Sequence, residues 1–164
     1  MNPAGTEDVI EREVRIAAPP EVVFQFFIDP VKMVQWKGMD AMLNPRPGGI
    51  YRVNVTGHDI ARGEYLEVTP YSRVVFTWGW EEGPIGPGSS TVEVTLTPDG
   101  DGTLVHLRHG GLSSESAGAH AEGWEHYLPR LALVAAGLDP GRDPWIQEQA
   151  EDVSSATSMD RKGD

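Results

Sequence analysis

The sequence contains no cysteine, and this absence excludes several kinds of chemistry at once. Disulfides, thiol nucleophiles and cysteine-ligated metal sites are all ruled out. The sequence also has no apolar run near the roughly 18 residues that a membrane-spanning helix needs. Its first residues lack the basic start and apolar core of a signal peptide. We therefore expect a cytoplasmic protein without membrane insertion.

Positive charge is scarce. Lysine and arginine number 13 against 25 acidic residues, which gives a formal net charge of −12 over 164 residues. A chain this acidic repels phosphate backbones, so a nucleic-acid partner is not expected. The hydrophobic content of 39%, with five Trp, four Tyr and four Phe, is enough to bury the core of one folded domain.

One long amphipathic stretch, Ser114 to Gly137, dominates the second half of the chain. Ser113 or Ser114 suits a helix N-cap, and Gly137 followed by Pro140 suits a helix end. Pro129 lies inside this stretch and predicts a kink rather than two helices, because the apolar stripe continues in phase across it. The stripe consists of Ala117, His120, Trp124, Leu128, Leu131, Ala135 and Leu138.

Nearly everything before this helix has the alternation typical of short strands. Two short helices, at 20–28 and 31–36, follow the first strand. The connections are too short for parallel crossovers, so the predicted class is α+β, with an antiparallel sheet covered by the long helix. The expected strands are 10–16, 51–55, 60–68, 73–80, 91–97 and 103–109.

We expect a single domain over residues 8–138, preceded by a flexible N-terminus at 1–7. Residues 139–164 form an acidic tail in which Trp145 and Ile146 can anchor a short stub. The remainder of this tail has the composition of a disordered segment.

Aromatic residues with a few polar groups are what a small-molecule pocket between the sheet and the helix would need. The alternative is that these rings fill the core, which is the more natural role for Trp124. The predicted ligand-binding residues are Trp36, Tyr51, Trp78, Trp80, His109, His120, Trp124, Tyr127 and Leu128. Contacts are expected to concentrate on the His120–Leu128 half of the helix.

No catalytic motif stands out, and the catalytic residues are unknown. His109, His120 and Glu67 are the candidates for acid/base chemistry, since they can meet across such a cavity. Glu67 can also pair with Arg52. This pair would lie either on the inner face of the sheet or on its exposed face as a cross-strand ion pair. The five histidines lack metal-ligand spacing, so neither a metal nor a cofactor is expected.

The order of several short motifs resembles one family. The motifs are Phe24…Asp29-Pro30…Trp36, Gly48-Gly49-x-Tyr51-Arg52, Gly63-x-Tyr65-x-Glu67-Val68-x-Pro70, Arg73-Val-Val-Phe-Thr77-Trp78, Thr103…His109 and Gly123-Trp124-x-x-x-Leu128-x-x-Leu131. Over about residues 8–138 the chain is similar to small bacterial proteins related to the Hsp90 ATPase activator domain. They belong to the helix-grip (SRPBCC) superfamily, with START domains, Bet v 1-like allergens and polyketide cyclases.

The resemblance implies a curved sheet of about six or seven antiparallel strands around the last helix, with a cavity between them. It does not imply one activity, because a fold hosts many functions. The leading hypothesis is a protein, monomeric or homodimeric, that binds a small apolar or aromatic ligand. The alternatives are a cyclase- or hydrolase-like enzyme on a polyketide-like or aromatic substrate and, less favoured, a chaperone ATPase activator.

Overall fold

The structure, a computed structural model, describes residues 8–81, 86 and 88–146. The N-terminal segment 1–7 and the part of the predicted tail from residue 147 onward lie outside the described residues.

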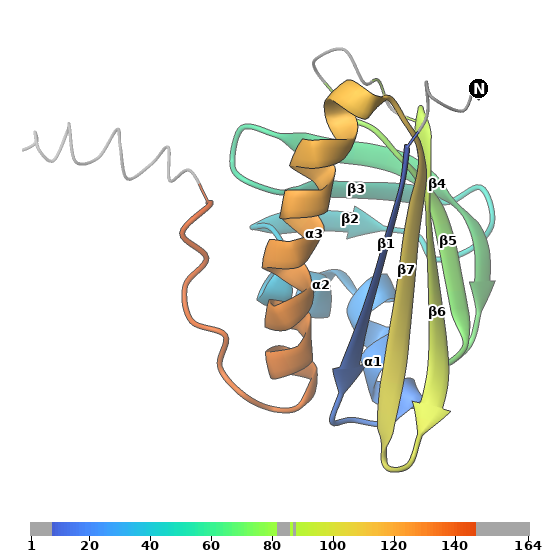
Figure 1. The fold of residues 1–164 in the computed structure, drawn as a ribbon, viewed down its shortest axis with the longest axis vertical. Coiled ribbons are helices and arrows are strands. Elements are labelled where there is room, and N and C mark those ends of the chain that lie inside the picture. Colours follow the sequence, from blue (N-terminus) through green and yellow to red (C-terminus); the bar gives the residue numbers. More distant parts are fainter. Residues whose placement is uncertain (1–7, 82–85, 87, 147–164) are drawn as a thin grey trace, which may run out of the picture.

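Seven strands form one antiparallel sheet in the order β1-β7-β6-β5-β4-β3-β2, and the sheet curves around one side of a long helix (Figure 1). The predicted α+β helix-grip class is therefore confirmed. In chain order the elements are β1 (Asp8–Ile16), α1 (Pro20–Ile28), α2 (Pro30–Trp36), β2 (Asp40–Leu43), β3 (Ile50–Asn54), β4 (Ile60–Thr69), β5 (Arg73–Trp78), β6 (Ser90–Asp99), β7 (Gly102–Leu112) and α3 (Ser114–Ala135).

The sequence prediction missed one strand and extended another by two residues, and the other strand ends differ by at most three residues. The edge strand β2 was missed because its four residues, none of them buried, give too short an alternation to recognise. The predicted strand at 73–80 ends at Trp78, and Trp80 forms only an isolated bridge with Ala61. The chain leaves the sheet there, which brings two tryptophans to one end of β5.

α3 is one continuous helix across Pro129, so the proline does not split it. Its first turn is capped by the Ser113 hydroxyl, which accepts a hydrogen bond from the Ser116 amide at 3.2 Å. Its end is a Schellman motif, in which Gly137, at φ +84°, donates to Val134 and Leu138 donates to Leu133. The exposed face of the helix carries Pro129, where the missing amide leaves the Glu125 carbonyl without its intrahelical donor.

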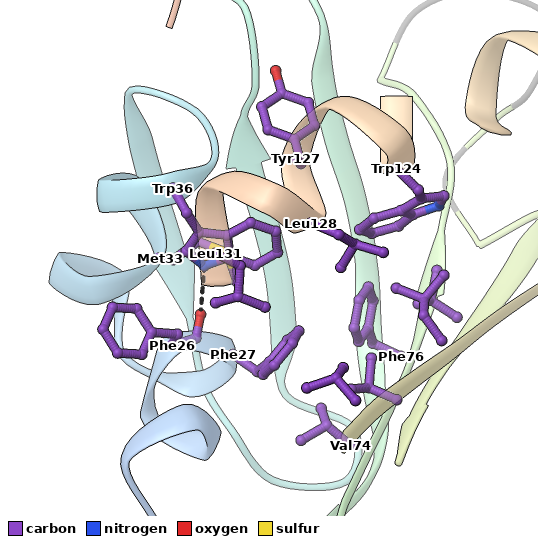
Figure 2. Packing of buried hydrophobic residues seen from close by; sticks show 14 of the residues in the cluster. Phe26, Phe27, Met33, Trp36, Val74, Phe76, Trp124, Tyr127, Leu128 and Leu131 are labelled. Atoms are coloured by element: carbon purple, nitrogen blue, oxygen red, sulfur yellow. Dashed lines mark hydrogen bonds between the residues drawn. The ribbon is translucent and has the colours of Figure 1, made fainter. Parts of the chain in front are cut away.

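The second half of α3 packs into a closed hydrophobic core. Figure 2 shows Leu128 and Leu131 directed into a cluster with Phe27 and Phe76. The Trp36 indole donates to the Phe26 carbonyl at 3.0 Å, which joins α2 to α1. The Tyr65 hydroxyl in β4 donates to the Phe27 carbonyl at 2.9 Å. These buried bonds hold both short helices against one end of the sheet and leave the first half of α3 to face the other end.

Candidate functional site

A pocket of about 210 Å³ lies between the first half of α3 and the C-terminal end of β5, at Trp78. From α3 it is lined by Ala119, His120, Gly123, Trp124 and Tyr127. The other walls are Lys37, Val55, Thr56, Asp59, Trp78, Trp80 and Trp145. An engineered cavity of about 150 Å³ is large enough to hold benzene, so this pocket has room for a compound with one substituted ring.

Small residues on α3 open the pocket between the aromatic walls. A Cβ added at Gly123 would meet no atom within 4 Å, so the helix leaves free space at that position. Across this space, Trp78 and Trp80 meet edge to face with their ring centroids 5.3 Å apart. Trp78 ends β5, and Trp80 follows two residues later in its bridge with Ala61, so both rings reach the pocket.

Trp145 closes the pocket from the segment that follows α3, which runs back alongside the helix (Figure 1). Its indole stacks on His126 at a centroid distance of 3.9 Å. His126 Nε2 and Asp143 Oδ1 are 2.8 Å apart, and the same carboxylate oxygen accepts from the Trp145 amide. We expected this residue only to anchor a short stub, and its place in the pocket wall was missed.

Lys37 is the least expected residue of the site. It is only 2% exposed, and its Nζ lies 4.0 Å from the centroid of the Trp78 ring and 4.3 Å from that of Trp124. Nζ has no hydrogen-bond partner among the described residues. Burial lowers the pKa of Lys37 well below its ordinary value of 10.5.

The local chain explains why this lysine points inward. α2 ends at Trp36, and Lys37 is extended, at φ −149° and ψ 115°. Gly38 then adopts φ +86°, and a Cβ there would lie 2.7 Å from the Asn54 carbonyl oxygen. The chain therefore passes tightly against the end of β3 and directs the Lys37 side chain beneath α3. From the sequence, a lysine directly after a short helix is expected to be exposed at the C-terminal end of that helix.

The pocket concentrates buried polar atoms that have no partner. Native proteins satisfy nearly all such atoms, so a cluster of exceptions at one place marks a polar site where water or a ligand can bind. Among the described residues, four of the five unpartnered buried side-chain atoms belong to residues that line the pocket. These four are Lys37 Nζ, Trp78 Nε1, His120 Nε2 and Tyr127 OH. The Tyr127 hydroxyl nevertheless interacts with the Asp143 carboxylate, and burial together with that carboxylate raises the pKa of Tyr127, so three of these atoms are left without any partner among the described residues.

His120 presents a hydrogen-bond acceptor when its ring is neutral. Its Nδ1 lies 2.9 Å from the Ser116 carbonyl oxygen, which can only accept, so Nδ1 carries the proton. Nε2 is then the unprotonated nitrogen. The pKa of His120 is lowered by burial and, to a smaller extent, by Lys37, while the bond to Ser116 opposes the shift.

His109 lies behind the pocket wall and does not line the pocket. The Trp124 indole can only donate, so His109 Nδ1 accepts its bond of 3.0 Å. Nε2 therefore carries the proton and donates to Ser90 Oγ at 2.8 Å, and that hydroxyl donates to the Trp78 carbonyl at 2.8 Å. Burial, with smaller contributions from His120 and Lys37, lowers the pKa of His109 to about 3. This neutral ring uses both nitrogens to position Trp124 and the end of β5.

Glu67 lies away from the pocket. Its Oε1 accepts from Arg73 Nε at 3.1 Å, and its side chain is 44% exposed. The possible pair with Arg52 does not form, because Arg52 binds Glu81 at 2.6 Å instead. A bulge in β4, between Tyr65 and Glu67, shifts the register just before Glu67 and made its side of the sheet hard to read from the sequence.

The structure brings together five of the predicted ligand-binding residues, Trp78, Trp80, His120, Trp124 and Tyr127. Trp36, Tyr51 and Leu128 lie in the closed core and do not line the pocket. All pocket residues from α3 precede Pro129, within 119–127. Reasoning from the sequence missed Lys37 and the β3–β4 loop, whose polar residues look like those of an ordinary turn.

Within the described residues, no group of three or more His, Cys, Asp and Glu side chains is arranged to hold a metal ion. In that same part of the chain, no helix is both long enough and apolar enough to cross a membrane.

Comparisons with known proteins agree with this architecture. Residues 17–136 match the family described as Activator of Hsp90 ATPase homolog 1-like protein. A solved AHSA1-like protein from Rhizobium etli is 48% identical over 87% of this chain and 91% of its own, with a TM-score of 0.69. A comparison with curated proteins finds no match.

Two further solved structures have the same fold at lower identity. DynU16, encoded in the dynemicin biosynthetic locus, is 25% identical over 83% of this chain and 50% of its own, with a TM-score of 0.71. CalU16 from Micromonospora echinospora is 25% identical over 79% of this chain and 85% of its own, with a TM-score of 0.64. The match over residues 17–136 and the close likeness to the Rhizobium protein show that the chain belongs to the Activator of Hsp90 ATPase homolog 1-like family, with a helix-grip fold.

Proposed function

We propose that this protein binds a small aromatic or apolar compound, about one substituted ring in size, in the pocket beneath the first half of α3. The observation that carries the proposal is the pocket itself, walled by the rings of Trp78, Trp80, Trp124, Tyr127 and Trp145. Pockets of this kind, apolar with a few polar groups, are the usual sites for small ligands.

The polar atoms of the same walls support a ligand rather than empty packing. A buried polar atom without a partner is unfavourable by roughly 1–3 kcal/mol, and this pocket gathers three, on Lys37, Trp78 and His120. A core selected only for stability would replace such groups by apolar ones. The occurrence of the related DynU16 in a biosynthetic locus also supports an association with small-molecule chemistry.

The alternative of a cyclase- or hydrolase-like enzyme has less support. It needed at least two of His109, His120 and Glu67 at one cavity. Only His120 lines the pocket, while His109 is fully hydrogen-bonded behind it and Glu67 pairs with Arg73. The arrangement therefore supports ligand binding over acid/base catalysis by those three groups.

Blocking the pocket tests the proposal. Gly123→Leu places a side chain in the free space, and Gly118→Leu is the matched control, an exposed position of α3 outside the pocket. We expect saturable binding of toluene and benzamide to the wild type and to Gly118→Leu by titration calorimetry. At a ligand concentration of ten times Kd, the unfolding free energy should rise by about 1.4 kcal/mol.

Gly123→Leu should lose this binding while remaining folded, because leucine has a better helix propensity than glycine. Two outcomes would show that the pocket is not the site. One is that neither toluene nor benzamide binds the wild type saturably, and the other is that Gly123→Leu and Gly118→Leu bind them with equal affinity.

A further inference from the structure

We propose that the ligand of this pocket is a small aromatic acid, whose carboxylate supplies the missing partner of Lys37. The inference rests on the proposed function and adds the chemical class of the ligand. It follows from the uncompensated buried amine, the donors beside it and the size of the pocket.

Lys37 lies unpaired in the part of the chain that the structure describes. Among the described residues it takes part in no ion pair and no side-chain hydrogen bond. Asp143 pairs with His126 through Oδ1, while its Oδ2 is unpartnered among the described residues, and Asp59 accepts from Thr56. Neither carboxylate contributes to the pKa of Lys37, which burial alone lowers. A buried ammonium without a counter-ion is strongly disfavoured. A ligand anion would restore the balance, since a buried charge is normally paired.

The aromatic walls hold the Lys37 side chain but do not replace an anion. The Trp78 and Trp124 faces attract an ammonium through their π-electrons. Neither ring offers an oxygen acceptor, and an indole nitrogen can only donate. Trp78 Nε1 is therefore a second unused donor in the same wall. A carboxylate has two oxygens that accept several bonds, which suits an amine and an indole N–H together.

The rest of the pocket selects the body of such a ligand. The rings of Trp80, Trp124 and Trp145 favour a flat aromatic group, and a volume of about 210 Å³ restricts it to about one ring. His120 Nε2 accepts when neutral, so it suits a hydroxyl on the ring rather than the carboxylate itself.

Negative charge at the rim does not prevent entry of an anion. Asp59 lines the pocket but is exposed, so water and salt screen its repulsion. Lys37 acts from a buried position where the effective dielectric is lower and attraction is stronger. The balance favours a monoanion whose carboxylate reaches the base of the pocket while its ring stays between the indoles.

Two probes of the same shape test the proposal. Benzoate carries the carboxylate, and benzamide is its neutral planar counterpart. At pH 7 we expect calorimetry to show benzoate binding the wild type at least about tenfold more tightly than benzamide, as a hydrogen bond to a charged group implies.

Lys37→Met should remove this preference and still bind benzamide, because methionine keeps the length and apolar stem of lysine. Lys32→Met is the matched control. It makes the same charge change on α2, at a side chain that lies over Phe26 and outside the pocket, so the preference should survive.

Equal affinity of the wild type for benzoate and benzamide would overturn the proposal, and so would a benzoate preference that persists in Lys37→Met. If toluene and benzamide bind and benzoate does not, the aromatic-acid inference fails while the proposed ligand-binding function stands. If no probe binds, both are overturned.

Discussion

At the scale of single residues, Lys37 works against the stability of the fold. It places a buried amine among aromatic rings, where no side chain of the described residues pairs with it. Burial lowers its pKa well below 10.5. Between that lowered value and 10.5 the unfolded chain binds the proton and the folded chain does not. The free energy of unfolding therefore rises with pH across this window, and at neutral pH the residue is a liability.

Lys37→Met should consequently raise the free energy of unfolding at pH 7, by about 1–4 kcal/mol, the range seen when buried ionic groups are replaced by apolar ones. Urea unfolding at pH 7 and pH 9 measures this, and the variant should also lose the part of the pH dependence that comes from Lys37. Lys32→Met should stay within about 0.5 kcal/mol of the wild type. A destabilised Lys37→Met would mean that the ammonium and the indole rings form a net stabilising contact.

At the scale of elements, α3 divides into two parts with different roles. The α3 residues that line the pocket lie within 119–127, whereas Leu128 and Leu131 pack into the closed core with α1 and the sheet. Pro129 lies just after the boundary, on the exposed face. The sequence predicted the helix, its caps and the continuous stripe, because these are local patterns. It did not predict β2, because this edge strand has only four residues and none of them is buried.

Replacing Pro129 by alanine tests what the proline does to this element. Pro129→Ala restores an amide that can bond to the Glu125 carbonyl, and we expect the free energy of unfolding to rise by up to about 3 kcal/mol. Affinity for benzamide should not change, since residue 129 does not line the pocket. Glu122→Ala, another exposed position of α3, serves as the control and should have little effect. A loss of stability in Pro129→Ala would show that α3 needs the proline's distortion to follow the sheet.

At the scale of the whole molecule, an acidic surface surrounds a centre of buried bases. The formal net charge is −12, yet His109, His120 and Lys37 lie together inside, and burial lowers the pKa of each. For His109 the folded pKa is about 3 against an ordinary value of 6.5. Between these values the unfolded chain holds more protons, so acid favours unfolding.

We therefore expect stability to fall as the pH drops below about 6.5, with His109 contributing up to about 1.4 kcal/mol per pH unit down to about pH 3. Chemical denaturation at pH 6.5, 5.5 and 4.5 measures the slope. His109→Gln should reduce it, although the variant starts from a lower stability because the network to Trp124 and Ser90 is broken. His106→Gln, at a side chain 41% exposed, is the matched control for the loss of a histidine. An unchanged slope in His109→Gln would contradict the neutral, buried ring.

The sequence by itself determined the class of the protein: an antiparallel sheet, two short helices, one long helix and a supply of aromatic residues for a pocket. Periodicity, caps and turns carry this information because they depend on neighbours within a few positions. Only the tertiary structure decided which residues share the pocket. In the structure, Lys37 points inward beneath α3, and Trp145 forms part of the pocket wall. His109 is hydrogen-bonded to Trp124 and Ser90 behind that wall. Burial, proton positions and missing partners are properties of groups that meet from distant parts of the chain, so no local pattern records them.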